Sequence, residues 1–257
     1  MFKEEQTIAV QAARTAGQII LSHYNTVYDV SYKSAEQPVT IADREADEAI
    51  KKITLGAFPE AGWLSEETND GPARLSKKRV WIVDPLDGTN EFINKIPEFA
   101  VSIALAQEGK ITVGVIYNPI TDELFSARLG GGAFLNKDPI RVSSQKNLNQ
   151  ATLLISHSEV NNGYWKKFEG QLTTQPLGST AYKMAKVASG YAEGCFSLKP
   201  KHEWDFAAGA LMVAEAGGRA SELSGLDFVY NKPNPLSKGI LHANQALYPE
   251  LLRICNT

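Results

Sequence analysis

The chain has 257 residues, 43% hydrophobic and 21% charged, which is the composition of an ordinary globular protein. Its formal net charge is −3, so it lacks the basic surplus of nucleic-acid-binding proteins, although a small phosphorylated substrate remains compatible with it. With only two cysteines, the chain has neither a disulfide framework nor a cysteine-rich zinc pattern.

No apolar run approaches the roughly 20 residues needed to span a membrane. The first six residues, MFKEEQ, also lack the basic start and apolar core of a signal peptide. We therefore expect a cytoplasmic protein with neither a membrane nor a nucleic acid as partner.

Helices and then a run of strands are predicted for the first half. Apolar residues at helical spacing predict a helix over residues 4–24, and the alternation through Tyr28, Val30 and Tyr32 predicts a half-buried strand. Residues 33–38 predict a turn, and Thr40 with Asp43 resembles a capping box that begins a helix reaching Leu55. Residues 63–65 form a short apolar approach to the acids Glu66 and Glu67. The further strands predicted here, the last four as an antiparallel meander, are residues 80–83, 99–106, 111–117, 123–127 and 133–135.

The second half alternates between strands and helices, as an α/β unit does. We place the join in the polar segment 138–149, so that residues 1–143 form an α+β half and residues 144–257 an α/β half of one catalytic unit. The strands predicted here are residues 152–156, 172–177, 192–197, 227–230 and 239–242, and the helices are residues 162–170, 179–189, 204–216 and 246–254.

Two acids, Asp84 and Asp87, follow the apolar run at residues 80–83, and Gly88 and Thr89 come directly after them. Carboxylates at the end of a strand can hold a hard cation. The N–H groups at the start of a helix can hold an anion. The stretch therefore suits a metal and phosphate site, with an ordinary Asp-rich turn as the alternative interpretation.

Two further acids follow apolar segments, Glu66 after Trp63-Leu64 and Asp205 after Trp204. Like charges gathered in an apolar setting repel one another unless cations neutralise them. Oxygen ligands favour Mg²⁺, Mn²⁺ or Ca²⁺. Taken singly, Asp205 can equally be a helix cap and Glu66 a solvated loop acid. The lone histidines His23, His157 and His242 have no ligand spacing and are assigned to packing or to the surface.

Three motifs together resemble the inositol monophosphatase superfamily of lithium-sensitive, Mg²⁺-dependent phosphomonoesterases. They are the segments 63–67 (WLSEE), 84–92 (DPLDGTNEF) and 204–218 (WDFAAG running to EAGG). The resemblance extends from Asp43 to Gly218. It implies a layered αβαβα sandwich, a homodimer and a small phosphorylated substrate. It also implies two or three Mg²⁺ ions, replaceable by Mn²⁺ and inhibited by Li⁺ and Ca²⁺.

The resemblance also implies a role for each matching residue. Glu66, Asp84 and the carbonyl of Leu86 would bind a first metal, and Asp84, Asp87 and Asp205 a second, with Glu66 reaching a third ion through water. The N–H groups of Gly88 and Thr89 would hold the phosphate, and Thr89 with Asp43 would activate the attacking water. Gly178-Ser179 matches a substrate-contacting pair, although a serine after a glycine is also a common helix start.

Small differences between this sequence and the family motifs indicate which substrate branch it resembles. Asn90-Glu91-Phe92 is closer to the 3′(2′),5′-bisphosphate nucleotidase (CysQ-type) branch of sulfur metabolism than to the inositol phosphatases, although Asn90 fits neither pattern. Leu198 stands where many inositol phosphatases carry an acid, and Lys199 and Lys201 lie nearby, which favours a second phosphate on the substrate. Each lysine alone can equally belong to a solvated loop.

The sequence therefore predicts hydrolysis of the 3′-phosphate of 3′-phosphoadenosine 5′-phosphate by metal-activated water. The alternative is an inositol-1-monophosphatase or a related sugar-phosphate phosphatase. A third possibility, a catalytically silent metal- or phosphate-binding regulator, is disfavoured because every ligand that the motifs imply is present.

Overall fold

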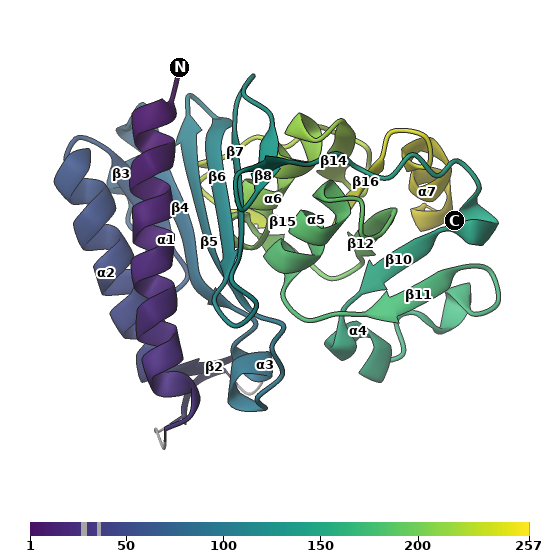
Figure 1. Cartoon of the computed structure of the whole chain (residues 1–257), viewed down its shortest axis with the longest axis horizontal. Helices are drawn as coiled ribbons and strands as arrows, with labels where there is room; N and C mark the ends of the chain where they lie inside the picture. The colour runs from purple at the N-terminus through teal and green to yellow at the C-terminus, as the bar shows by residue number, and fades with distance from the viewer. Residues whose placement is uncertain (27–29, 35–36, 257) are drawn as a thin grey trace.

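Helices and sheets alternate in five layers in the computed structural model, which describes residues 1–26, 30–34 and 37–256. Figure 1 shows the order: helices α1 and α2, a first sheet, helices α5 and α6, a second sheet, and helix α7. Hydrophobic clusters occupy the spaces on either side of the first sheet and beneath α7. The predicted layered αβαβα sandwich is confirmed.

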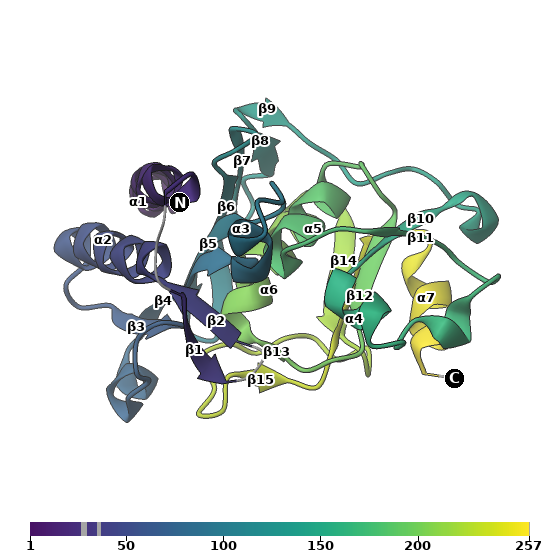
Figure 2. The same cartoon turned by 90° about the horizontal axis from the view of Figure 1, so that it is seen from below.

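The outer layer consists of α1 (Lys3–Tyr24) and α2 (Ile41–Ala57), which lie side by side on one face of the first sheet (Figure 2). The predicted capping box is present at the start of α2. The hydroxyl of Thr40 accepts a hydrogen bond from the N–H of Ala42 at 3.2 Å, and Asp43 Oδ2 accepts one from the N–H of Thr40 at 2.7 Å. This cap fixes where Asp43 lies in the fold.

The first sheet has seven strands in sequence order, with β3 parallel to β4 and every other neighbouring pair antiparallel. The predicted meander is therefore confirmed. Side chains of β5 alternate, with Val101 and Ile103 facing α1 and α2 and Ala100 and Ala104 facing α6. The strands are β3 (Gly62–Ser65), β4 (Arg79–Asp87), β5 (Ala100–Gln107), β6 (Lys110–Asn118), β7 (Glu123–Arg128), β8 (Ala133–Leu135) and β9 (Asp138–Pro139).

The second sheet has the order β11-β10-β12-β16-β14, with β10 parallel to both of its neighbours and β16 antiparallel to both of its own. Between the two sheets lie α5 (Thr180–Ala188) and α6 (Glu203–Glu215), and α7 (Tyr248–Cys255) covers the far face (Figure 1). The strands are β10 (Thr152–Ile155), β11 (Thr173–Pro176), β12 (Gly194–Ser197), β14 (Gly218–Glu222) and β16 (Ile240–Asn244).

Shorter elements connect these layers. Strands β1 and β2 form an antiparallel pair, as do β13 and β15. The remaining elements are β1 (Val30–Ser34), β2 (Gln37–Thr40), η1 (Pro72–Ser76), α3 (Thr89–Ile93), η2 (Leu148–Gln150), α4 (His157–Asn161), η3 (Lys166–Phe168), β13 (Lys201–His202) and β15 (Leu236–Ser237). No helix within the described ranges is long and apolar enough to cross a membrane.

The predicted helix at residues 162–170 is wrong. Helix α4 ends at Asn161, and Gly163 has a φ of 74°, which a continuing helix does not allow. The aromatic residues that suggested a helix are used otherwise: Trp165 and Phe168 pack against Phe196 of the second sheet, with ring centroids 4.4 and 5.3 Å from it. Tertiary packing, and not local helical spacing, thus determines the conformation of residues 162–170.

Smaller differences from the predictions occur elsewhere. The strand predicted at residues 227–230 is irregular chain, in which Phe228 packs against Phe206 of α6. Strand β14 was not predicted, because its Gly218 was read only as part of a helix end. The turn predicted at residues 33–38 belongs in part to β1 and β2, and Tyr28 lies outside the described residues.

Candidate functional site

Strand β4 continues to Asp87 instead of ending at Val83, and it carries both acids of the central motif. In its antiparallel pairing with β5, Asp84 lies opposite Ser102 and Asp87 opposite Ala100, so β4 holds one extra residue between them. Residues three apart in a regular strand face opposite sides. The extra residue is a bulge that restores a common side, and both acids line the same cavity.

The chain turns sharply after Asp87. Gly88 has a φ of 104°, and a Cβ at this position would lie 3.0 Å from Cβ of Phe99, so glycine is required for both reasons. Thr89 is the first residue of α3. The N–H groups in the first turn of a helix have no acceptor within the helix, so the N–H of Thr89 can donate to an acceptor outside it.

Three carboxylates from three elements meet at this place. Glu66, Asp84 and Asp205 each offer an oxygen, and these oxygens all lie within 4.8 Å of one another. Glu66 follows β3, and its N–H bonds the carbonyl of Val83 at 3.2 Å, which puts it beside Asp84. Asp205 belongs to the first turn of α6, where its Oδ2 accepts a hydrogen bond from the N–H of His202 at 2.9 Å.

The electrostatics of this cluster favour a cation. Burial raises the pKa of Asp84 well above its usual value, and the carboxylates of Glu66, Asp87 and Asp205 raise it further. Burial likewise raises the pKa of Asp205 to about 7, although the ammonium of Lys201 opposes the shift. Buried acids that repel one another are the setting that a divalent cation with oxygen ligands neutralises. The cluster therefore fits Mg²⁺.

Thr89 and Asp43 are hydrogen-bonded, as the resemblance implies. Thr89 Oγ1 donates to Asp43 Oδ1 at 3.0 Å, with the carbonyl of Leu86 a second acceptor at 3.2 Å. The other oxygen of Asp43 accepts from the N–H and the hydroxyl of Thr40, both at 2.7 Å. Burial raises the pKa of Asp43, although these hydrogen bonds oppose the shift. The hydroxyl can thus pass a proton to a fixed carboxylate.

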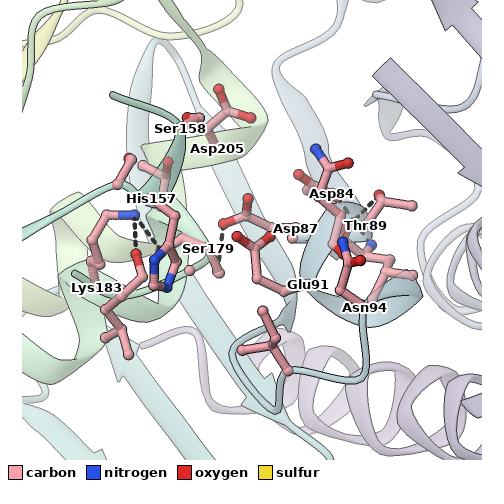
Figure 3. A pocket seen from close by; sticks show the side chains of 18 of the residues that line it. Asp84, Asp87, Thr89, Glu91, Asn94, His157, Ser158, Ser179, Lys183 and Asp205 are labelled. Atoms are coloured by element: carbon pink, nitrogen blue, oxygen red, sulfur yellow. Dashed lines mark hydrogen bonds between the residues drawn. The ribbon is translucent and has the colours of Figure 1, made fainter. Parts of the chain in front are cut away.

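Asp87 is held from the second half of the chain. Its Oδ2 accepts a hydrogen bond from Ser179 Oγ at 2.6 Å (Figure 3). It accepts another from the N–H of Ala181, also at 2.6 Å. The neighbouring Gly178 donates its N–H to Glu98 Oε2 at 2.7 Å. A Cβ on Gly178 would lie 2.6 Å from the backbone carbonyl oxygen of Glu98, so only glycine fits here. Gly178-Ser179 therefore supports an acid of the site as well as facing the cavity.

A cavity of about 600 Å³ brings most of the predicted residues together. Figure 3 shows Asp84 and Thr89 on one side of it, His157 and Lys183 on the other, and Asp87 between them, bonded to Ser179. The predicted site residues that line it are Glu66, Asp84, Leu86, Asp87, Gly88, Thr89, Gly178, Ser179, Lys201 and Asp205.

Two predicted residues lie elsewhere. Asp43 is buried behind Thr89 and acts on the cavity only through it. Lys199 is not brought to the cavity: its ammonium lies over the ring of Tyr164, 5.3 Å from the centroid, and its N–H bonds Glu159. The chain bends at Lys199, whereas Lys201 is the first residue of β13, and of these two lysines Lys201 lines the cavity.

Some lining residues were not predicted from the sequence. Lys183 is 3% exposed, and His157, assigned to packing or to the surface, lines the cavity and bonds Glu98 at 2.8 Å. Spacing does point to Lys183, since it lies four residues after Ser179 on a helix of small and apolar residues. For His157 no signal exists, because the helix predicted near it was placed too late in the chain.

The fold and the carboxylate cluster define a metal-binding protein of the phosphatase type. The model of the inositol monophosphatase family matches residues 2–256, and the chain belongs to this family. The family comprises metal-dependent phosphoric monoester hydrolases that use Mg²⁺.

Individual relatives cover most of the chain. It is 36% identical to an inositol-1-monophosphatase of Rhizobium meliloti over 85% of both chains. The crystal structure of the extragenic suppressor protein suhB from Bartonella henselae is 35% identical, with a TM-score of 0.88 over 99% of both chains. The structure of 2′AMP-bound SaIMPase-II is 28% identical, with a TM-score of 0.80 over 96% of this chain and 91% of that one. None of these three bears the name of the bisphosphate nucleotidase branch.

Proposed function

We propose that this protein is an Mg²⁺-dependent phosphomonoesterase that hydrolyses inositol monophosphate. The observation that carries the proposal is the arrangement of the cavity, in which Glu66, Asp84 and Asp205 converge and the hydroxyl of Thr89 lies against Asp43. The name of the relative from Rhizobium meliloti supports inositol 1-phosphate as the substrate. The sequence alone ranked this substrate second, and the relatives now favour it.

The acids of the cavity have distinct tasks in this proposal. Glu66, Asp84 and Asp205, together with Asp87 and the carbonyl of Leu86, would hold the Mg²⁺ ions. Mg²⁺ held there would polarise the phosphate oxygens and lower the pKa of a water molecule enough for it to react near neutral pH. Whether two or three ions bind at once is left to metal titration.

The chain's own groups then position the reactants and move the proton. The N–H groups of Gly88 and Thr89, at the start of α3, donate to the phosphate. Thr89 Oγ1 accepts a proton from the attacking water and donates its own to Asp43 Oδ1, which it contacts at 3.0 Å. Because Thr40 occupies the other oxygen of Asp43, the carboxylate keeps one orientation throughout.

A second candidate is the 3′-phosphate of 3′-phosphoadenosine 5′-phosphate. Two observations favour it: Lys183, Lys201 and His157 all line the cavity, and Leu198 replaces the acid that an inositol-binding site would use. The relative solved with 2′AMP bound adds support for a nucleotide phosphate. Cations beside the cavity would attract a second phosphate.

Phosphate release with Mg²⁺ decides between these candidates. The panel contains inositol 1-phosphate, 3′-phosphoadenosine 5′-phosphate, 2′AMP, fructose 1,6-bisphosphate and NADP, with Asp84→Asn as the blank. We expect the highest kcat/KM for inositol 1-phosphate. A clear preference for the adenosine bisphosphate would reverse the ranking. Metal-saturated protein that releases phosphate from none of them would point instead to a regulatory metal-binding member of the family.

Assembly and metal choice belong to the same proposal. By family resemblance we propose a homodimer that accepts Mn²⁺ in place of Mg²⁺ and is inhibited by Li⁺ and Ca²⁺, and from the sequence features alone we propose a cytoplasmic location. Light scattering on the purified protein measures the assembly, and phosphate release in the presence of each ion measures the metal choice.

A further inference from the structure

Lys183 is a buried lysine placed directly beneath the turn that supports Asp87. Its side chain is on α5, and its ammonium donates to the carbonyl of Leu177 at 3.1 Å and to that of Ser179 at 3.0 Å. Lysine is almost never fully buried unless it is paired. Here the two carbonyls lie on either side of Gly178, so one ammonium is hydrogen-bonded to both ends of the turn.

The turn needs these hydrogen bonds because its backbone is strained at Ser179. Ser179 has a φ of 55° and a ψ of 124°, a backbone region that residues other than glycine rarely adopt. A strained residue of this kind persists only where the surroundings hold it. The carbonyl of Ser179 is held by both the ammonium and the backbone N–H of Lys183, the latter at 3.2 Å.

The strained conformation directs Ser179 at Asp87. Its Oγ accepts a hydrogen bond from the N–H of Tyr182 at 3.0 Å and donates to Asp87 Oδ2 at 2.6 Å, where the N–H of Ala181 also donates. With Oδ2 held by two donors, the carboxylate of Asp87 cannot rotate, and its other oxygen is presented in a fixed direction. Residues that orient a metal ligand in this way tune metal affinity.

We propose that Lys183 is a positioning residue for the metal site: its ammonium fixes the turn at residues 177–179 so that Ser179 and Ala181 orient Asp87 for cation binding. The proposal rests on the proposed function in one respect, that Asp87 is a metal ligand. It differs from a substrate-binding role, which the position of Lys183 at the cavity would also allow. In the structure, two of the three N–H groups of Lys183 bond the chain itself.

Metal binding measured without substrate tests the proposal. Lys183→Met keeps the aliphatic stem and removes the ammonium, and calorimetry with Mn²⁺ and Mg²⁺ gives the affinity directly. We expect metal binding to weaken by roughly 10- to 100-fold, as loss of a group that orients a ligand does. Once metal saturates the variant, the KM for inositol 1-phosphate should stay within about threefold (about 0.7 kcal/mol) of that of the unmodified protein, because the ammonium bonds the carbonyls of Leu177 and Ser179.

Lys186→Met is the matched control. Lys186 is on the same helix and pairs with Glu123 at 2.9 Å, away from the cavity, so this change should leave metal affinity unaltered. Unchanged metal affinity in Lys183→Met, with or without a raised KM, would overturn the proposal; a raised KM would make Lys183 a substrate contact instead.

Two further variants separate positioning from folding. In Lys183→Ala, propylammonium supplies the missing atoms through the cavity and should restore metal affinity, whereas 1-propanol, which lacks the charge, should not. Ser179→Ala should weaken metal binding similarly, and adding Lys183→Met to it should cost little more, because both act on Asp87. If Lys183→Met does not fold, Ser179→Ala carries the test, and unchanged metal affinity there would also overturn the proposal. Metal binding without phosphate release would refute the proposed function and leave this inference intact.

Discussion

The two walls of the cavity differ in how the chain builds them. The wall from the first half is made by β4 and α3, where Asp84, Asp87, Gly88 and Thr89 lie within six consecutive residues. The opposite wall combines α4, the turn before α5, and the segment leading into α6. A single short motif thus supplies Asp84, Asp87 and Thr89, whereas three separated segments supply the groups that would meet the rest of the substrate.

The walls also differ in charge. On the first, burial and mutual repulsion raise the pKa of Asp84 far above its usual value. On the second, burial alone would lower the pKa of Lys201, but Asp205 and Asp87 outweigh it and raise that pKa. Without a cation, the carboxylates of the acidic wall therefore repel one another. On the opposite wall, the neighbouring acids instead stabilise the charged form of Lys201. We infer that chemistry resides mainly in the first wall and substrate discrimination in the second.

The largest expected effect comes from removing a charge on the acidic wall. Asp84→Asn should lower kcat by roughly 10³-fold or more, the scale seen when one essential catalytic group is lost. The same change should raise the melting temperature of the metal-free protein, because it relieves the repulsion from Glu66, Asp87 and Asp205. Phosphate release and thermal unfolding in a chelator measure the two effects.

The opposite signs of these two effects are the diagnostic. A variant that loses both activity and metal-free stability would show that Asp84 supports the fold and not a cation. Asp138→Asn serves as the control, since this exposed acid on β9 lies outside the cavity and should change neither quantity.

The hydroxyl of Thr89 comes next in size. Thr89→Ala should lower kcat by about 10²-fold, the lower end of the range for general acid–base groups, with little change in metal affinity. Thr89→Ser keeps the hydroxyl that bonds Asp43 and should retain most of the activity. Equal loss in both variants would mean that the methyl group, and not the proton path, is what matters. Initial rates across metal concentrations separate these outcomes.

The acidic wall could be predicted from the sequence because its parts are contiguous. Asp84, Asp87 and Thr89 belong to one motif, and the capping box at Thr40 and Asp43 placed Asp43 at the start of a helix. What the sequence could not show was the bulge that turns Asp84 and Asp87 to the same side, since it arises from pairing with β5. The family resemblance implied that Asp84 and Asp87 both bind metal, but it did not show that a bulge brings them to the same side.

The second wall could be predicted only in part, for a physical reason. Its residues meet through the packing of α4 and α5 around the second sheet. Local sequence patterns do not predict such contacts between distant segments. Trp165 and Phe168 looked helical but pack on Phe196, which shifted the predicted helix away from His157. Lys199 and Lys201 looked equivalent in sequence, but the ammonium of Lys199 lies over Tyr164, whereas Lys201 pairs with Ser237 and lines the cavity.

A smaller effect on stability is expected behind the second wall. His242 is fully buried on β16, and within the described part of the chain neither ring nitrogen has a hydrogen-bond partner. Burial, and then the charge of Lys183, lower its pKa from 6.5 to about 3. Because the unfolded chain binds the proton first, this contribution is complete above pH 6.5 and is lost as the pH falls toward 3. At pH 5 the loss is about 2 kcal/mol.

Urea unfolding at pH 7.5 and pH 5 measures this loss. The reference is His242→Leu, which has no titrating ring, so the unfolding free energy of the unmodified protein minus that of the variant should fall by about 2 kcal/mol at the lower pH. A difference that does not change with pH would show that the ring stays neutral, or stays charged, in both folded and unfolded states.

The smallest expected effect, about tenfold, concerns which ester the second wall prefers. Lys201→Met should lower kcat/KM for 3′-phosphoadenosine 5′-phosphate by about tenfold more than that for inositol 1-phosphate, because a charged hydrogen bond to a second phosphate is worth roughly 1.5 kcal/mol. Lys201 also neighbours Asp205, so the change can alter metal binding as well. Comparing two substrates at saturating Mg²⁺ cancels that shared effect. Lys199→Met is the matched control, since its ammonium lies over Tyr164, and the ratio should not move. A ratio that is also unchanged in Lys201→Met would mean that the cations of this wall serve the acids and not the substrate, leaving the polyol as the better fit.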